Sequence, residues 1–151
     1  MKTATAREQA FLQSMKETGL RPDPYLIVEG DHTLEGGHRA CSELLSGGRK
    51  ATAVVCSNDL TAMGVMKRSH ELGIQIPKDL SVIGFDDIRL AQFTLPPLTT
   101  VQMSQSELAC LAFNSLITEA ERKEPSMKSA EYGLKTSLVL RKSTSIIGSR
   151  S

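Results

Sequence analysis

The sequence lacks features that mark several functional classes. Its 18 Lys and Arg residues nearly balance 17 Asp and Glu residues, which leaves a formal net charge of +1. Proteins that bind nucleic acid through its phosphates carry a clear excess of basic residues. The composition therefore does not favour DNA binding by this chain. No apolar run approaches the roughly 20 residues needed to cross a membrane, and the N-terminal stretch MKTATAREQAFLQSM lacks the apolar core of a signal peptide. We therefore expect a cytoplasmic protein without a membrane partner.

Cysteine and catalytic motifs are also scarce. Cys41, Cys56 and Cys110 are widely spaced without a C-x-x-C pair, which predicts reduced thiols and not a disulfide framework or a zinc site. The glycine pairs in EGGHRA and SGGRKA do not match a phosphate-binding loop, and no G-x-S-x-G elbow is present. We therefore expect no metal, no cofactor and no catalytic residue, and predict that the protein is not an enzyme.

The pattern of the remaining sequence predicts an α/β domain. Its 151 residues are 40% apolar, which suits one globular unit with a real core. Helical spacing and turn residues predict helices at 7–18, 33–45, 58–72 and 105–122. Apolar runs predict strands at 24–30, 51–56, 80–85 and 98–102, and one or two more within 131–144. Such alternation is typical of a three-layer α/β/α fold around a parallel sheet.

Strong polar side chains follow two of these strands. Asn58 comes after the strand at 51–56, and Asp86 after the strand at 80–85. Ligands of parallel α/β sheets bind beyond the carboxyl ends of the strands, so we expect both residues to face one crevice. Asn58 is also a favoured helix N-cap, with Ser57 and Asp59 as competing caps, and a cap can bind ligand as well.

The acidic pair at the end of the second strand has alternatives of its own. Asp86 has the alternative role of bonding to the backbone of its own turn. Adjacent carboxylates rarely converge on one bond, which argues against acid–base catalysis by Asp86 and Asp87. We interpret Asp87 as structural or interfacial.

Several segments in fixed order carry a resemblance to a known family. They are AVVCSNDLTAMGVM, LGIQIPKDLSVIGFDD, PPLTTV and LVLRKST. The chain, from about residue 7 to residue 144, resembles the C-terminal part of the lactose-repressor (LacI/GalR) family of bacterial transcription regulators. The resemblance implies a periplasmic-binding-protein-like type I fold that is incomplete here. Residues 1–151 would form the C-terminal effector-binding and dimerisation lobe, and residues 104–135 resemble the crossover into a first lobe that is absent, as is the DNA-binding headpiece.

The resemblance also implies which residues bind the ligand. Arg7 matches the arginine of the family's R-x-x-G-F helix, and a guanidinium suits hydroxyl or carboxylate groups because it offers several fixed donors. His32 lies where the family often places a stacking aromatic, Asn58 would serve neighbouring sugar hydroxyls, and Asp86 would accept hydrogen bonds from the ligand. The alternatives are a solvated Arg7 and a surface-loop His32. Met103 departs from the polar residue that several members carry at that position.

The implied function is that of a sensor. A small effector, a sugar or a nucleoside, would bind a homodimer and change DNA binding by a headpiece that is not in this chain. One alternative is the sugar-binding component of a transporter, which shares the fold but normally carries a signal peptide. Another is a small flavodoxin-like α/β enzyme, for which the sequence offers neither a nucleophile–base set nor a phosphate loop.

Overall fold

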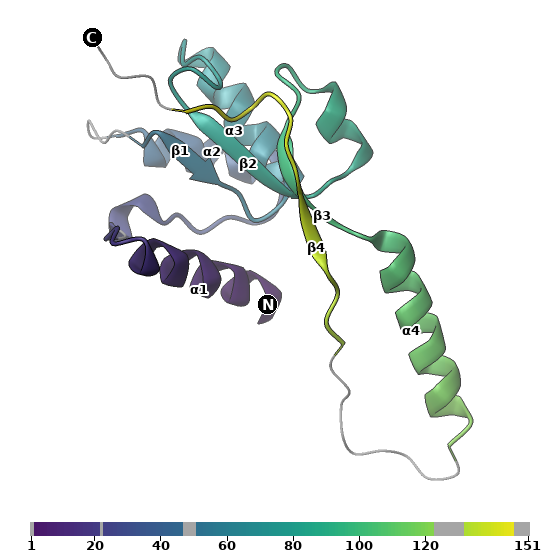
Figure 1. Ribbon diagram of the computed structural model, residues 1–151. Helices are drawn as coiled ribbons and strands as arrows, with labels where there is room; N and C mark the ends of the chain where they lie inside the picture. Colours follow the sequence, from purple (N-terminus) through teal and green to yellow (C-terminus); the bar gives the residue numbers. More distant parts are fainter. Residues whose placement is uncertain (1, 22, 47–50, 123–131, 147–151) are drawn as a thin grey trace.

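The sheet and its helices follow the predicted alternation. A computed structural model describes residues 2–21, 23–46, 51–122 and 132–146. The helical elements are α1 (Lys2–Glu17), η1 (Pro24–Leu26), α2 (Leu34–Leu44), α3 (Asp59–Glu71), η3 (Arg89–Phe93) and α4 (Gln105–Ala120). The strands are β1 (Ala53–Val55), β2 (Ser81–Asp86), β3 (Thr99–Met103) and β4 (Thr136–Val139). Figure 1 shows their arrangement.

The four strands form one sheet in the order β1-β2-β3-β4. β1, β2 and β3 are parallel, with Val54 opposite Val82 and Gly84 opposite Thr100. β4 closes the edge as an antiparallel partner of β3. The predicted α/β class is therefore confirmed, with a mixed sheet in place of a purely parallel one.

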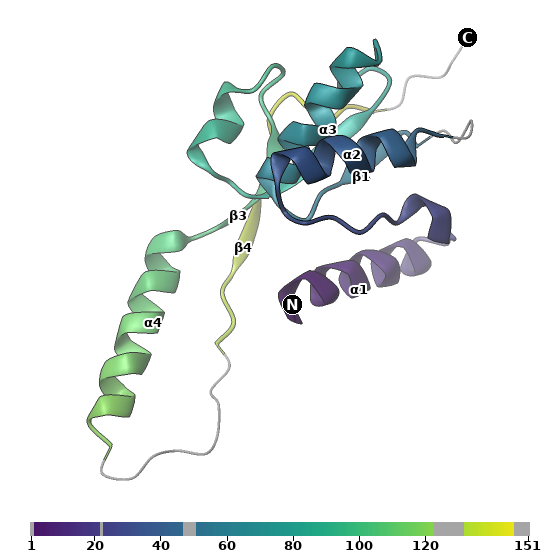
Figure 2. The ribbon, with the colours of Figure 1, turned by 180° about the vertical axis from the view of Figure 1, so that it is seen from behind.

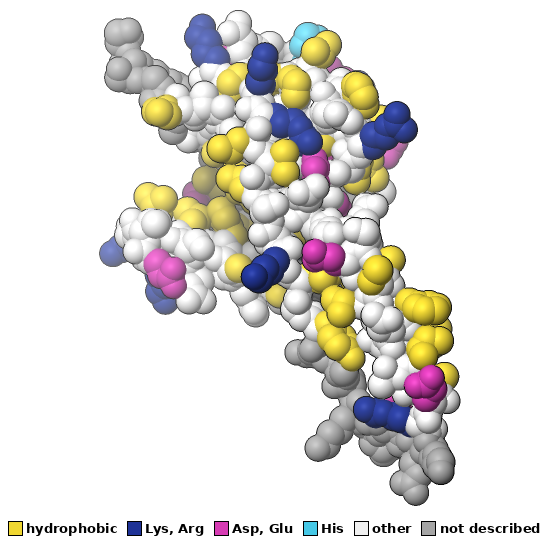
Figure 3. All heavy atoms as spheres, turned by 45° about the vertical axis from the view of Figure 1, so that its right-hand side comes forward, with side chains coloured by type: hydrophobic (Ala, Val, Ile, Leu, Met, Phe, Trp, Pro, Cys, Tyr) yellow, Lys and Arg dark blue, Asp and Glu magenta, His cyan; other side chains and the backbone are white. Residues whose placement is uncertain are grey.

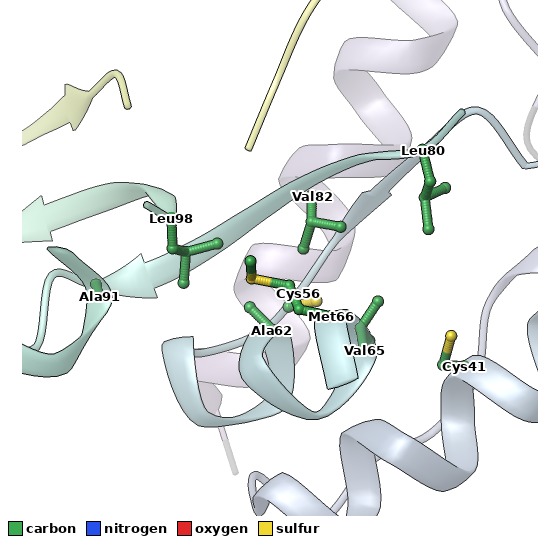
Figure 4. Close-up of a cluster of buried hydrophobic side chains, with 9 residues drawn as sticks. All are labelled: Cys41, Cys56, Ala62, Val65, Met66, Leu80, Val82, Ala91 and Leu98. Carbon is green, nitrogen blue, oxygen red and sulfur yellow. The ribbon is translucent and has the colours of Figure 1, made fainter. Parts of the chain in front are cut away.

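Helix α3 packs against β2 and α2 packs against α3; the view from behind in Figure 2 shows the two helices in front of the sheet. Between α3 and β2 lies the hydrophobic core, which includes Val65, Leu80 and Val82 and is drawn in Figure 4. Side chains alternate between the faces of a strand, so Phe85 points away from α3. It meets Arg7 of α1 there, which places α1 toward the opposite face.

Local chemistry explains where the two central helices begin and end. The Thr33 hydroxyl accepts a hydrogen bond from the Gly36 amide, 2.9 Å away, and caps α2. Gly73 follows α3 with φ +73°, the left-handed conformation that glycine adopts most easily after a helix. The helices predicted at 33–45 and 58–72 are thus confirmed to within a residue or so.

Two glycines let α2 and α3 touch through their backbones. A Cβ atom on Gly37 would lie 2.1 Å from the carbonyl oxygen of Thr61, and one on Gly64 would lie 2.0 Å from that of Leu34. No side chain fits at such distances. The two helices therefore form one tightly joined unit.

Two strand predictions need correction. Residues 24–30 do not form a strand: residues 24–26 are a 3-10 turn, because Pro24 opens it and the Asp23 carboxylate accepts the Tyr25 amide at 2.9 Å. The strand expected at 51–56 is shortened to β1 and is not buried throughout, since Val55 is 56% exposed. β1 lies at the edge of the sheet, where one strand side and part of one face remain open.

Helix α4 projects away from the sheet (Figure 1). The structure describes all of its residues, and none is buried. Leu108, Phe113, Leu116 and Ile117 are exposed, and hydrophobic side chains cover much of this arm in Figure 3. The helix predicted at 105–122 is confirmed. Whether residues 104–135 cross to another lobe stays a prediction, and residues 123–131 lie outside the described part.

Among the described helices, none combines the length and apolar character that crossing a membrane requires. The three cysteines are all described and all free. Cys41 and Cys56 are buried, whereas Cys110 is exposed on α4. Burial raises the pKa of the Cys56 thiol to about 12.

Candidate functional site

The four residues predicted to bind ligand gather around the carboxyl ends of β1 and β2. The Asn58 side-chain amide donates to the backbone oxygen of His32, 2.9 Å away. The Ser57 hydroxyl lies 3.0 Å from Nδ1 of the His32 ring, and Arg7 donates to the Ser57 carbonyl oxygen. The segment of residues 57–58 therefore joins three of the predicted residues, from α1, from the loop before α2 and from the start of α3.

Asn58 is the N-cap of α3. Its Oδ1 accepts the Thr61 amide at 2.9 Å, which confirms the capping alternative and excludes Ser57 and Asp59 as the cap. A carboxamide has two donor protons and two acceptor lone pairs. One proton and one lone pair of Asn58 thus stay available for a ligand while the cap is intact.

Arg7 is held in place and not freely solvated. Its guanidinium carbon lies 3.8 Å from the centre of the Phe85 ring, within the range of a cation–π contact. The side chain is half-buried. The sequence gives no sign of this role for Phe85, because an apolar residue near a strand end normally indicates core packing. The structure makes Phe85 the platform on which Arg7 lies.

His32 lies in a sharply turned loop. Its φ of 62° is unusual for a residue other than glycine, and the ring is half-buried against Ser57. The hydrogen bond between the two side chains orients the ring. His32 thus lies in a loop with a partly enclosed ring, and its role in ligand binding stays a prediction.

Asp86 ends β2 and starts an unusual turn. Asp86 and Asp87 have φ values of 109° and 53°. Burial raises the pKa of the Asp86 carboxyl, while the nearby charges of Arg7 and His32 act to lower it. Arg7 and His32 thus lie close enough to Asp86 to act on its charge, and the structure brings all four predicted residues together.

Asp87 turns away from these residues and pairs with Arg141, with 2.7 Å between Oδ1 and Nη2. Arg141 also donates to the Leu98 carbonyl oxygen at 2.9 Å. Asp87 thereby fastens the turn to the segment that follows β4, as its structural interpretation implies.

Sequence reasoning missed the role of Asp59. This residue is fully buried, and its carboxylate accepts the Ile88 amide at 2.8 Å and the Thr100 hydroxyl at 2.5 Å. A Cβ on Gly84 would lie 2.2 Å from Asp59 Oδ1, so β2 needs glycine there. The detectable signal was an acidic residue directly after the capping Asn58, at the junction of a strand and a helix.

The arrangement suits a small polar ligand. Arg7 supplies donors, Asp86 supplies acceptors, and Asn58 supplies both. Within the described ranges, no cluster of His, Cys, Asp and Glu could hold a metal ion. Two hollows lie elsewhere, one between residues 28–31 and α2 and one between α1 and residues 19–21. The four polar residues of the candidate site are themselves half-buried.

The chain is similar in sequence to several transcription repressors. Residues 1–144 match the periplasmic binding protein-like domain. The chain is 36% identical over 129 residues to the HTH-type transcriptional repressor PurR of Klebsiella pneumoniae (strain 342), covering 85% of this chain and 38% of the repressor. It is 38% identical over 115 residues to the PurR repressor of Serratia proteamaculans, covering 76% of this chain and 34% of that protein. The chain therefore spans little more than a third of these relatives.

Solved structures agree with the sequence matches. A LacI-type transcription regulator from Bifidobacterium animalis subsp. lactis superposes with a TM-score of 0.85 at 29% identity, covering 95% of this chain and 51% of that one. A LacI family regulator from Enterococcus faecium with bound ribose gives a TM-score of 0.81 at 28% identity, over 93% of this chain and 51% of the other. Because family model, relatives and structures agree, the chain belongs to the periplasmic-binding-protein-like domain family and corresponds to part of the effector-binding domain of LacI/GalR-type transcription regulators.

Proposed function

We propose that this chain senses a small polar effector, a sugar or a nucleoside, for a LacI-type regulator. Ligand binding would be coupled to DNA binding by a headpiece outside these 151 residues. The observation that carries the proposal is the convergence of Arg7, His32, Asn58 and Asp86 at the carboxyl edge of the sheet. A solved relative holds ribose, and another is a complex with cellobiose. The transporter alternative receives no such support, since the relatives reported above are transcription regulators.

The coupling is a difference in affinity between two states. An effector that contacts Arg7 on α1 and Asp86 on β2 at once favours the arrangement in which these elements are closest. Binding at a second site that prefers another arrangement then becomes less favourable, typically by about 1–3 kcal/mol. No step of this scheme breaks a covalent bond.

The ligand role is tested by titrating the chain with ribose, glucose, cellobiose, adenosine and inosine in a calorimeter, at up to millimolar concentrations. Removing Asp86 should weaken binding of the active compound by about 10- to 100-fold, since a hydrogen bond to a charged group contributes roughly 1.5–3 kcal/mol. Asp79→Ala is the matched control, because Asp79 is an aspartate outside the site; its carboxylate accepts the Gln75 amide at 2.9 Å. Equal affinities of Asp86→Ala and the parent would reject the site.

We also propose that the chain forms a homodimer through the segment that includes η3. Leu90, Phe93 and Leu95 are 58%, 66% and 93% exposed. Exposed apolar side chains grouped in this way are typical of protein–protein interfaces. Sedimentation velocity should show a dimer that Phe93→Glu converts to monomer. A parent chain that stays monomeric at high concentration would contradict this.

A further inference from the structure

We propose that Asp59 is a positioning residue for the candidate site, and that its buried carboxylate holds the turn that presents Asp86. The inference deepens the proposed function, on which the ligand role of Asp86 depends. Asp59 itself does not need to touch the ligand. Its contacts lie on the inner side of the turn, against β3.

The carboxylate of Asp59 reaches the turn by two routes. Oδ2 accepts the backbone amide of Ile88 directly, at 2.8 Å. Oδ1 accepts the hydroxyl of Thr100 at 2.5 Å, and the same Thr100 oxygen lies 3.4 Å from the amide of Asp87. One side chain at the start of α3 thus fixes both residues that follow Asp86 and ties them to β3.

The turn needs such support. Asp86 and Asp87 both have positive φ, at 109° and 53°, and such conformations are unfavourable for residues other than glycine. They persist when surrounding contacts leave the backbone no alternative. The bonds from Ile88 and Thr100 to Asp59, with the Asp87–Arg141 ion pair on the outer side, supply that restraint.

Simpler roles do not account for Asp59. The helix already has its cap in Asn58. An acidic residue in the first turn does stabilise a helix through its dipole, but an exposed one would do so without losing water. Asp59 is fully buried, and burying a carboxylate is costly unless its hydrogen bonds are satisfied. Burial and the nearby charges of Asp86 and Asp87 raise its pKa, which adds to that cost.

The close approach is also built into β2. A Cβ on Gly84 would lie 2.2 Å from Asp59 Oδ1, so any larger residue would push the carboxylate from its place. Gly84 lies two residues before Asp86 on the same strand. Because it has no side chain, it leaves the space in which the Asp59 carboxylate reaches Thr100.

The test uses nuclear magnetic resonance on the full chain without ligand. The coupling between the amide and α protons of Asp86 is small at a φ of 109° and grows when the residue relaxes to negative φ. In Asp59→Ala we expect this coupling to rise. We also expect exchange of the Ile88 amide to accelerate at least tenfold beyond the change seen for amides within α3.

Two variants control for loss of stability and of charge. Ser143→Ala removes a buried hydroxyl that accepts the Thr99 amide at 2.7 Å and donates to the Val82 oxygen at 2.6 Å. It should destabilise the same core and leave the Asp86 coupling unchanged. Asp59→Asn should also keep the coupling, because a carboxamide can accept from Ile88 and donate to the Thr100 hydroxyl.

An unchanged Asp86 coupling in Asp59→Ala overturns the proposal, as does an Asp59→Asn chain that releases the turn as fully as the alanine variant. If Asp59→Ala does not fold, Thr100→Val decides the matter. It removes one of the two routes and should raise the coupling, and no change would again overturn the proposal. Titration with ribose, glucose, cellobiose, adenosine and inosine is independent of these results: if none of them binds but the coupling responds, the proposed function fails and the positioning role stands.

Discussion

The guanidinium carbon of Arg7 lies 3.8 Å from the centre of the Phe85 ring, so a charged residue of α1 stacks on the last apolar residue of β2. The same guanidinium donates to the Ser57 carbonyl oxygen. These contacts bring α1 to the carboxyl edge of the sheet, next to Asp86.

This stacking predicts a measurable coupling energy. In a double-mutant cycle of Arg7→Met and Phe85→Leu, followed by urea unfolding, we expect the two substitutions to be non-additive by about 0.5–1 kcal/mol. Methionine and leucine keep apolar volume while removing the charge and the ring. Additive effects within 0.2 kcal/mol would show that the contact contributes nothing to stability.

The backbone contact between α2 and α3 predicts intolerance at Gly64. An alanine there would place its Cβ 2.0 Å from the Leu34 carbonyl oxygen, and two helices must separate to admit it. We expect the unfolding free energy to fall by about 1–3 kcal/mol. Gly30→Ala is the control, since nothing lies within 4 Å of its added Cβ. Similar midpoints for the two variants in urea would contradict the prediction.

The lowered pKa of Glu71 predicts that the folded chain loses stability in acid. Hydrogen bonds from Lys67, His38 and Arg68 lower the pKa of its carboxyl from 4.5 to about 2. A depressed pKa means that the folded chain binds the proton less readily than the unfolded chain. The stabilising contribution is therefore complete above pH 4.5 and is lost as the pH falls toward 2.

The measurement is the unfolding midpoint of the parent and of Glu71→Gln between pH 6 and pH 2.5. The difference between them should shrink as the pH falls, because the parent carboxyl becomes neutral. Glu43→Gln, on α2, serves as a control for removing a carboxylate elsewhere. A constant difference over this range would mean that Glu71 has no depressed pKa.

Much of the fold could be predicted because its signals are local. Thr33 and Asn58 cap their helices through their own side chains, and Gly73 ends α3 through its own backbone. The apolar residues of β2 predict a central strand without reference to its neighbours. The strand predicted at 24–30 is wrong because two local signals conflict there. The apolar residues favour a strand, but the turn made by Asp23 and Pro24 prevails at residues 24–26.

The candidate site was predictable only in part. Asn58 and Asp86 followed from their places after two parallel strands as well as from the resemblance, and Arg7 and His32 from the resemblance alone. The structure brings the four together without testing what they bind. Phe85 and Asp59 were missed because their roles depend on partners distant in the sequence. Arg7 is 78 residues before Phe85, and Thr100 is 41 residues after Asp59. No local pattern records such pairings.

The glycine contacts between α2 and α3 have a consequence for binding thermodynamics. His32 precedes α2 and Asn58 begins α3, so the backbone contact at Gly37 and Gly64 keeps these two residues in fixed relative positions before any ligand arrives. In the proposed binding this half of the site is preorganised, so the protein would lose little conformational entropy there. Arg7 belongs to a separate helix on the other face. The affinity of the site therefore depends on how far α1 is already immobilised, and substitutions that stiffen α1 should tighten binding without touching a ligand contact.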